Sequence, residues 1–403
     1  MQQVVIIGGG HAAAQLCASL AEGNFEGRVT LVSNEDRLPY HRPPLSKTFI
    51  KDPAAEPQAL RAQAMYDKAG IEVLLGETAV AIDREGREVA LASGRRLPYD
   101  TVVLATGTSA RRLPGVPAEA PNVAYLRNAA DAERLRAALN DAPSVTVLGG
   151  GFIGLEIAAT AGQLGKPVAV FEAAPRLLAR SVSPEAADHV VKTLRESGVT
   201  IHLGASADRF EFEGERLSAV FVGEQRHAVD ILVAGIGAVP ETLLAEAAGL
   251  ECANGVVVDD HMRTSDPAIY AIGDCTAFPY SRWGERLRLE SVQNANDQAR
   301  TVAGVLLHQP TPYQALPWFW SDQGALRLQI AGLARPDTER VIRPGTKEGS
   351  FSVLHFDGGH LVCIESINAP LDHMAARKLL ERGLQPSREQ LLDPAVPLKA
   401  HLG

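Results

Sequence analysis

Val4-Val5-Ile6-Ile7-Gly8-Gly9-Gly10, near the start of the chain, shares one plan with Val145-Thr146-Val147-Leu148-Gly149-Gly150-Gly151. In each stretch a short apolar run leads into a glycine-rich turn and then into an alanine-rich segment with helical periodicity. A second apolar run follows each helical segment, at residues 29–32 and 168–171. This order predicts two strand–helix–strand units. Their continuous apolar strands are typical of parallel sheets that are buried on both faces.

The glycine spacing indicates what the two turns hold. The first turn reads Gly8-x-Gly10-x-x-Ala13, and the second reads Gly149-x-Gly151-x-x-Gly154. Such glycines allow a tight turn and let a pyrophosphate approach backbone N–H groups at a helix N-terminus. The sequence therefore predicts two dinucleotide sites, one in each unit.

The residue that follows the second strand of each unit indicates the ribose contact. In the first unit this residue is Asn34 or Glu35, and the spacing leaves the choice open. In the second unit it is Glu172, whose carboxylate would pair with a ribose 2′-hydroxyl and repel a 2′-phosphate. We therefore expect NADH rather than NADPH at the second site, although Arg176 and Arg180 are close enough in sequence to bind a phosphate.

The remaining strands indicate an α/β protein with two Rossmann-like dinucleotide-binding domains and a C-terminal α+β domain. Residues 102–107 predict a buried strand that ends in a turn at Thr106 and Gly107, and residues 231–235 predict a return strand before Gly237. After residue 320 the apolar residues alternate, and a hairpin is predicted around residues 357–359. We expect a discontinuous first domain at 1–110 and 243–320, an inserted domain at 111–242, and a third domain at 321–403.

Two dinucleotide sites in one chain suggest that a hydride passes from a nicotinamide to a flavin. Asp274 ends a further strand and suits a carboxylate that binds the ribityl hydroxyls of a flavin. Arg42-Pro43-Pro44-Leu45-Ser46-Lys47 sets two cations around a rigid turn, with Arg42 expected at the diphosphate and Lys47 at the isoalloxazine. Glu156 lies just inside the second glycine turn's helix. We expect Lys47 and Glu156 to pair as catalytic residues that act by positioning and electrostatics.

Composition limits the alternatives. The net charge of −9 argues against a general nucleic-acid or membrane-surface binder, and no apolar run is long enough to span a bilayer. Strand residues begin at Val4, so we expect no targeting peptide and a cytoplasmic protein. None of the four cysteines falls at residues 38–44, where a disulfide or peroxide reductase of this fold needs a redox cysteine. We expect no metal site.

Five motifs of this sequence resemble, in order, those of a known family. They are Arg42-Pro43-Pro44-Leu45-Ser46-Lys47 and the segments 149–156, 272–274, 290–295 and 317–323. Together they look like the FAD-dependent, NADH-specific ferredoxin reductases of the putidaredoxin reductase type, a branch of the glutathione-reductase-like flavoproteins. The resemblance covers nearly the whole chain. It implies FAD and NADH as cofactors and a separate, acidic [2Fe–2S] ferredoxin as the electron acceptor, in a monooxygenase or aromatic-ring dioxygenase system.

The resemblance also implies roles for single residues. Trp320 resembles an aromatic residue near the flavin on the side that faces the ferredoxin. The family's FAD contacts fall on Ala12, Lys47, Val80, Arg127, Asp274 and Val292, with Arg42 beside them. To these we add, as cofactor contacts, the turn residues Gly8, Gly10, Thr106, Gly107, Gly149, Gly151, Ile153, Gly154 and Gly237.

A ferredoxin would need a local basic patch, because ferredoxins are typically acidic and this chain is itself negative. Arg300 matches an arginine that relatives use for docking. The other candidates are Arg282, Arg286, Arg288, Lys378 and Arg382.

Two other functions remain open at this point. A rubredoxin reductase, or another NADH-dependent flavin oxidoreductase, would differ only in its acceptor. The Trp318-Phe319-Trp320 segment and the Pro43-Pro44 turn favour a [2Fe–2S] protein over these. A non-enzymatic protein similar to apoptosis-inducing factor would share the Pro43-Pro44 turn, but such proteins carry targeting sequences and long insertions.

Overall fold

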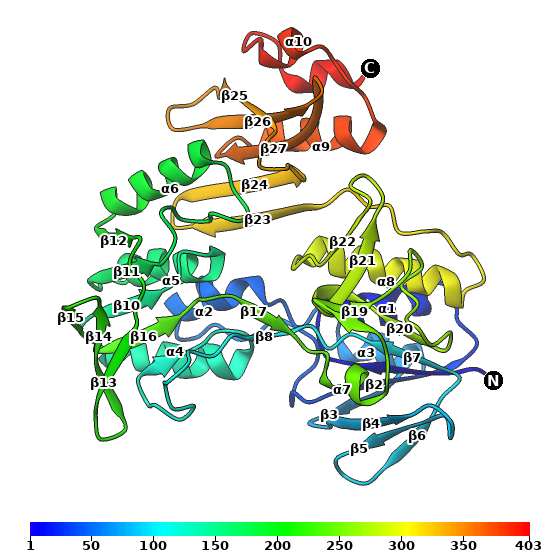
Figure 1. The fold of residues 1–403 in the computed structure, drawn as a ribbon. Helices are drawn as coiled ribbons and strands as arrows, with labels where there is room; N and C mark the ends of the chain where they lie inside the picture. The colour runs from blue at the N-terminus through cyan, green and yellow to red at the C-terminus, as the bar shows by residue number, and fades with distance from the viewer. The chain divides into compact units, whose positions relative to one another are not determined.

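The computed structural model describes residues 1–403, which form two compact units. The first unit consists of Met1–His41, Gln58–Ser109 and Val239–Ala315. The second consists of Arg42–Pro57, Ala110–Ala238 and Leu316–Gly403. Each unit is therefore assembled from segments that are distant in sequence, and Figure 1 colours them by residue number. The three-domain division remains an interpretation of the sequence.

A five-stranded parallel sheet forms the centre of the first unit, in the order β20-β7-β1-β2-β3. The apolar run at residues 4–7 lies in the central strand β1, and β2 pairs beside it as the strand–helix–strand pattern predicts. Because the strands are parallel, their carboxyl ends meet at one edge, where the first glycine turn follows β1. The strands are β1 (Gln3–Ile7), β2 (Arg28–Ser33), β3 (Glu72–Leu75), β7 (Thr101–Leu104) and β20 (Ile269–Ala271).

Helices α1 (His11–Glu22) and α8 (Val292–Leu306) pack against each other in this unit. The predicted apolar face of α1 is buried, including Leu16, Cys17 and Leu20. Smaller elements complete the unit: β4 (Ala79–Asp83), β5 (Glu88–Leu91), β6 (Arg96–Pro98), β18 (Cys252–Ala253), β19 (Gly255–Val257), β21 (Thr276–Tyr280), β22 (Glu285–Leu287), α3 (Gln63–Lys68), α7 (Leu243–Ala247) and η2 (Gly273–Cys275).

The second unit contains a parallel sheet of the same kind, in the order β12-β11-β10-β16-β9. Helix α5 packs against β10 and β11, and a three-stranded meander contributes Leu217 and Val220 to a core shared with Phe171 and Leu232. The elements are β9 (Val123–Ala124), α4 (Ala129–Asp141), β10 (Val145–Leu148), α5 (Phe152–Gln163), β11 (Val168–Glu172), α6 (Pro184–Glu196), β12 (Val199–Leu203), β13 (Arg209–Glu213), β14 (Arg216–Val222), β15 (Gln225–Ala228) and β16 (Ile231–Ala234).

The same unit also holds a five-stranded antiparallel sheet, in the order β23-β24-β27-β26-β25. The predicted hairpin is confirmed, since β26 and β27 are joined at Gly358 and Gly359. Figure 1 shows this sheet with α9 and α10 beside it, and Leu379 and Ile364 share its core. The elements are β23 (Trp318–Gln323), β24 (Leu326–Gly332), β25 (Glu339–Pro344), β26 (Phe351–Asp357), β27 (His360–Ile367), α9 (Pro370–Arg382), α10 (Arg388–Leu392) and η3 (Leu398–Leu402).

Residues Arg42–Pro57, which we call the strap, belong to the second unit although the chain on both sides of them belongs to the first. The strap contains η1 (Pro43–Ser46) and α2 (Thr48–Lys51), which pack against α4 and α5. In sequence the strap falls inside the stretch 1–110 expected to form the first domain. It nevertheless packs against helices of the second unit, unlike the chain on either side of it.

Two short strands, β8 (Thr108–Ala110) and β17 (Ala238–Pro240), pair with each other where the chain passes from one unit to the other. The return strand expected at residues 231–235 corresponds instead to β16, which lies within the parallel sheet of the second unit. Among the helices described above, none is both long and apolar enough to cross a bilayer.

Candidate functional site

The first glycine turn leaves room for a phosphate at the start of α1. Gly8 has a φ of +125°, and a Cβ at this position would clash with the carbonyl oxygen of Ala105, so only glycine fits. Gly10 is the N-cap residue of α1, and no side chain caps the helix there. A Cβ at Gly10 would meet no atom within 4 Å. The N-terminus of α1 therefore has no side-chain cap and has open space beside Gly10, which suits the pyrophosphate of a dinucleotide.

The register of the two parallel sheets identifies a residue that sequence reasoning missed. Ile7 lies opposite Val32 in the first unit, as Leu148 lies opposite Phe171 in the second. The next residue, Ser33, therefore occupies in the first unit the position that Glu172 occupies in the second. Only the register of the paired strands gives this match, because the spacing along the sequence differs between the two units.

Asn34 and Glu35, the two predicted ribose contacts, come one and two residues after Ser33. Asn34 is exposed. The Glu35 carboxylate accepts a hydrogen bond from the Tyr40 hydroxyl at 2.6 Å, and the Glu35 amide donates to Ser33 Oγ at 3.2 Å. The structure holds Glu35 in place, and the choice between Asn34 and Glu35 stays a prediction.

Other predicted FAD contacts of the first unit follow the ends of its strands. Thr106 and Gly107 follow β7, and both bond to the backbone of Glu241. Thr106 Oγ1 donates to the Glu241 carbonyl at 2.8 Å, and the Glu241 amide donates to the Gly107 carbonyl at 2.9 Å. Asp274 lies in η2, directly after β20. Ala12 lies in the first turn of α1, near Gly273.

Val292 and Val80 complete the predicted contacts of the first unit. Val292 begins α8, whose N-terminus is capped by Ser291, which accepts from the Asn294 amide at 3.1 Å. Val80 on β4 is 53% exposed, which is unusual for valine and fits a surface that an apolar ring system would cover.

The second glycine turn repeats the first in the second unit. Gly149 has a φ of +103°, and a Cβ there would clash with the carbonyl oxygen of Gly235. Gly151 is the N-cap residue of α5 and no side chain caps this helix either. Ile153, in the first turn of α5, is 45% exposed. An uncapped helix start with a bare apolar side chain beside it suits a second dinucleotide.

Glu172 and the two arginines after it bear on the choice of nicotinamide cofactor. The Glu172 carboxylate accepts from the amides of Gly150 at 2.5 Å and Ala174 at 2.7 Å, so it is fixed beside the glycine turn. The Arg176 guanidinium donates to the carbonyls of Val182 and Ala179 at 2.6 and 2.8 Å. Arg176 is thus engaged within its own loop, which leaves Arg180 as the arginine exposed near Gly237.

Lys47 and Glu156, the two predicted catalytic residues, form an ion pair in the second unit, with Glu156 buried and Lys47 partly buried. Lys47 Nζ lies 2.6 Å from Glu156 Oε2, and it also donates to the Pro43 carbonyl at 3.0 Å. Ser46 Oγ donates to the same Glu156 oxygen at 2.5 Å. The other oxygen, Glu156 Oε1, accepts from Ser321 Oγ on β23 at 2.7 Å. Three donors from two distant segments therefore hold one carboxylate, and sequence reasoning assigned no role to either serine.

Arg42 and Arg127, predicted to contact FAD, also lie in the second unit. Arg42 Nη1 donates to the Arg127 carbonyl at 3.1 Å, and the Arg127 amide donates to Asp131 at 3.0 Å. These contacts orient the backbone around the two guanidinium groups. The predicted FAD contacts are thus divided between the two units.

Trp320 lies half-buried on β23, one residue before Ser321. Its ring stacks on Trp318 with centroids 5.8 Å apart, and the Arg377 guanidinium lies 4.8 Å from the centre of the Trp318 ring. The two tryptophans therefore form a continuous aromatic pair that ends beside a cation of α9.

The cysteines show no sign of redox chemistry. All four are free thiols, and burial raises the pKa of Cys17 to about 12. Burial also raises the pKa of Cys275 and Cys363 above the ordinary thiol value. A thiol held in its protonated form is a poor nucleophile, so these three buried cysteines are poorly suited to thiol chemistry.

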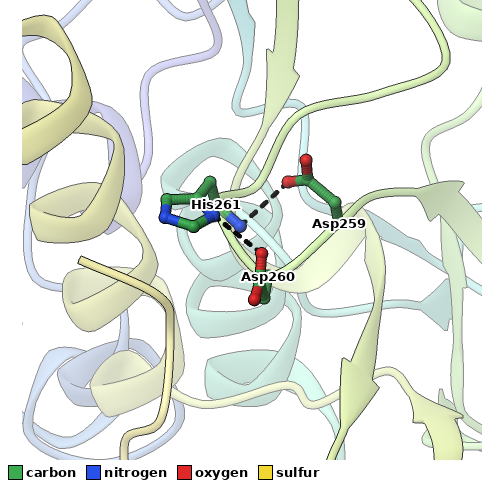
Figure 2. A group of neighbouring side chains, drawn as sticks. All are labelled: Asp259, Asp260 and His261. Atoms are coloured by element: carbon green, nitrogen blue, oxygen red, sulfur yellow. Dashed lines mark hydrogen bonds and ion pairs between the residues drawn. The ribbon is translucent and has the colours of Figure 1, made fainter. Parts of the chain in front are cut away.

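One acidic cluster outside the predicted site lies at Asp259, Asp260 and His261 (Figure 2). Asp259 Oδ1 accepts from the amides of His261 at 2.8 Å and Arg263 at 2.9 Å, and His261 Nδ1 lies 2.7 Å from Asp260 Oδ1. These bonds are those of an exposed turn, and we assign no metal to it.

Two uncapped dinucleotide turns and a lysine–glutamate ion pair define a flavin- and nicotinamide-dependent oxidoreductase. Known proteins agree with this class. Residues 2–299 match the family described as pyridine nucleotide-disulphide oxidoreductase, and residues 318–402 match the reductase C-terminal family. The chain belongs to the pyridine nucleotide-disulphide oxidoreductase family, and its cofactors are FAD and NAD(H).

Similar proteins include rhodocoxin reductase from Rhodococcus erythropolis, which is 41% identical over 399 residues covering 98% of this chain and 93% of that protein. The solved ferredoxin reductase for the CYP199A2 system from Rhodopseudomonas palustris superposes with a TM-score of 0.96 at 42% identity, over 100% of both chains. The covalent complex of putidaredoxin reductase with putidaredoxin gives a TM-score of 0.94 at 36% identity, covering 100% of this chain and 98% of that one.

Proposed function

We propose that this chain is an NADH:ferredoxin reductase. It takes a hydride from NADH onto FAD and passes two single electrons to a separate, acidic [2Fe–2S] ferredoxin that feeds an oxygenase. The observation that carries the proposal is the ion pair between Lys47 and Glu156, whose buried carboxylate lies on the helix that begins at the second glycine turn. The relatives support the acceptor, since one solved reductase of this fold is covalently joined to putidaredoxin.

The chain's own residues bind and position the reactants. The uncapped N-termini of α1 and α5 present amides to two pyrophosphates. Glu156 keeps Lys47 in one place as a cation, and the Pro43-Pro44 turn limits the backbone before it. Bound FAD supplies the chemistry, because it accepts electrons in a pair and releases them singly. Neither Lys47 nor Glu156 needs to exchange a proton, since hydride transfer depends on orientation and electrostatics.

The identity of the electron acceptor is the part of the proposal for which an alternative function exists. A rubredoxin reductase would share every feature of the two dinucleotide sites. The Trp318–Trp320 pair, which ends beside Arg377, favours an acidic iron–sulfur protein that docks near these rings. Whether the terminal enzyme is a haem-thiolate monooxygenase or a ring dioxygenase depends on that ferredoxin. We place the reaction in the cytoplasm, where NADH is produced.

The test mixes the purified protein with NADH under anaerobic conditions and follows the flavin absorbance. We expect yellow protein with one non-covalent FAD per chain, and faster bleaching by NADH than by NADPH. Cytochrome c reduction should then need an added ferredoxin, and rubredoxin in its place should be a poor acceptor. Folded, colourless protein that ignores added FAD would contradict the proposal, and so would reduced flavin that no [2Fe–2S] ferredoxin reoxidises.

A further inference from the structure

The strap (Arg42–Pro57) cannot hold its shape by itself. Its helix α2 spans four residues, too few to be stable alone, and the last carbonyls of so short a helix have no partner within it. Phe49 and Ile50 are nevertheless buried. The strap therefore takes its shape from groups outside it, and those groups lie on α4 and α5.

Arg136 on α4 makes the most extensive of these contacts. Its Nη1 atom lies 3.3 Å from the Phe49 carbonyl oxygen, 3.2 Å from that of Asp52 and 3.1 Å from that of Ala55. The same guanidinium lies 4.3 Å from the centre of the Phe49 ring. One side chain thus serves the carbonyls at the end of α2 and in the loop after it, and it also covers the strap's buried aromatic ring.

Helix α4 is a firm base for this contact. A capping box closes its N-terminus, with Asn128 accepting from the Asp131 amide at 2.8 Å and Asp131 accepting from the Asn128 amide at 3.2 Å. Leu135, next to Arg136 in sequence, is fully buried. The guanidinium therefore extends from a helix that is fixed at its start and along its apolar face.

The position of α2 determines where Lys47 lies. Lys47 is the residue directly before α2, and its carbonyl accepts from the Lys51 amide at 3.2 Å. On the other side of the strap, Thr160 Oγ1 of α5 donates to the Ser46 carbonyl at 2.8 Å. Lys47 thus sits between an anchor on α5 and the helix that Arg136 holds on α4.

We propose that Arg136 is a positioning residue that fastens the end of the strap to α4 and thereby keeps Lys47 on Glu156. Lysine can replace it only in part. An ammonium group has no plane that stacks on the Phe49 ring, and it cannot keep this contact while it donates to the three carbonyls. The fastening is a property of the second unit alone. Its consequence for hydride transfer rests on the proposed function.

The experiment measures amide hydrogen exchange in the purified flavin-containing protein. The amides of Lys51, Asp52 and Ala55 all donate to carbonyls within the strap, so they report directly on its opening. In Arg136→Gln these amides should exchange at least about tenfold faster, as expected when a charged hydrogen-bonding group is lost. Amides of α1 should keep their wild-type rates. Arg136→Lys should fall between wild type and Arg136→Gln.

Arg134→Gln is the matched control. Arg134 lies two residues away on the same helix and pairs only with Asp131, at 2.6 Å, with its side chain 72% exposed. Removing it takes the same charge from α4 without touching the strap, so the strap amides should exchange as in the wild type.

Several results would overturn the proposal. Unchanged strap exchange in Arg136→Gln would show that the fastening lies elsewhere. Faster exchange in both the strap and α1 would show that Arg136 supports the whole fold. Fast strap exchange with an unchanged rate of flavin reduction by NADH would disprove the claim that Arg136 positions Lys47 for hydride transfer. If wild type itself reduces no ferredoxin while Arg136→Gln still loosens the strap, the fastening stands and the proposed function fails.

Discussion

At the scale of single residues, Glu156 shows what a buried carboxylate requires. Both of its oxygens are removed from water, a loss that costs several kcal/mol unless donors replace the solvent. Lys47 and Ser46 supply donors to one oxygen, and Ser321 supplies one to the other. Because the donors come from two segments that are far apart in the sequence, the pair depends on how the second unit folds.

Replacing Ser321 with alanine should weaken both stability and flavin reduction. The change leaves Glu156 Oε1 buried without a donor, which costs about 1–3 kcal/mol. We expect a lower melting temperature and a slower flavin reduction by NADH, with recovery in Ser321→Thr, where a hydroxyl remains. Ser366→Ala is the control, because Ser366 is equally buried in the same sheet but bonds only the neutral Ser352, at 3.0 Å. Equal effects of the two alanine variants would contradict this role.

Glu172 should determine the choice of nicotinamide cofactor. In Glu172→Ala the repulsion of a 2′-phosphate is lost, and so is a hydrogen bond to the ribose that is worth about 1–2 kcal/mol. We expect the NADH-to-NADPH ratio of kcat/KM to fall by about tenfold or more. Glu213→Ala, at the exposed end of β13, should leave the ratio unchanged. An NADPH preference in the wild type would show that the exposed Arg180 binds the phosphate.

At the scale of elements, α9 combines an exposed face with a buried histidine. Leu371, Met374 and Lys378 are exposed, whereas His373 is buried against the sheet. Neither ring nitrogen of His373 has a hydrogen-bond partner. Burial, with smaller contributions from Arg377 and Arg327, lowers the pKa of His373 to about 4. The helix is therefore docked through an imidazole that must stay neutral.

The stability of the protein should fall as the pH drops from about 6.5 toward 4. In this window the unfolded chain binds a proton at His373 and the folded chain does not, so acid favours unfolding by up to about 3 kcal/mol. Above pH 6.5 the contribution is constant. In His373→Leu the drop in melting temperature between pH 7.5 and 5 should be smaller than in wild type. His360→Leu, at the exposed start of β27, should match wild type. A pH dependence in His373→Leu equal to that of wild type would refute the assignment.

At the scale of the whole molecule, the arginines of the predicted basic patch differ in how far their guanidinium groups are already engaged. Arg286 donates to the Val258 carbonyl at 2.7 Å, and Arg288 pairs with Glu290 at 2.6 Å with its side chain largely buried. Arg300 pairs with Asp297 at 2.5 Å but keeps its side chain 55% exposed. Of these three, Arg300 is the one best able to meet an acidic partner.

Arg300→Glu should therefore slow ferredoxin reduction, by about three- to tenfold at low salt, and weaken its salt dependence. Flavin reduction by NADH should not change. Arg134→Glu is the control, since Arg134 pairs with Asp131 in the same i,i+3 geometry and is also exposed. If both half-reactions fall together, Arg300 supports the fold or the FAD site, and if neither changes, the ferredoxin docks elsewhere.

How far the sequence predicts this site depends on how local each contact is. Lys47 and Glu156 could be predicted, because each belongs to a contiguous motif with its own chemistry. The contact of Ser321 could not, because it meets Glu156 across 165 positions, and the motif at residues 317–323 does not indicate which partner the serine has. Arg136 could not be told from Arg134, since its partners are backbone carbonyls that leave no trace in side-chain patterns.

The same limit applies to the fold. The two glycine turns predict both parallel sheets, because strand, turn and helix follow one another along the chain. The packing of the strap could not be predicted in this way. Its apolar residues Phe49 and Ile50 indicate that it is buried, but they do not indicate which unit buries them. Ser33 becomes recognisable only when the register of β1 and β2 is known.

The burial of the thiols has a practical consequence for spectroscopy. Cys17, Cys275 and Cys363 are out of reach of a maleimide dye, and Cys252 alone is partly exposed. A Cys252→Ser background should thus take up almost no label in the folded state. A single cysteine introduced at Lys378 on α9 or at Arg282 could then carry a fluorophore, and quenching by the iron–sulfur cluster of an arriving partner would map where it lands.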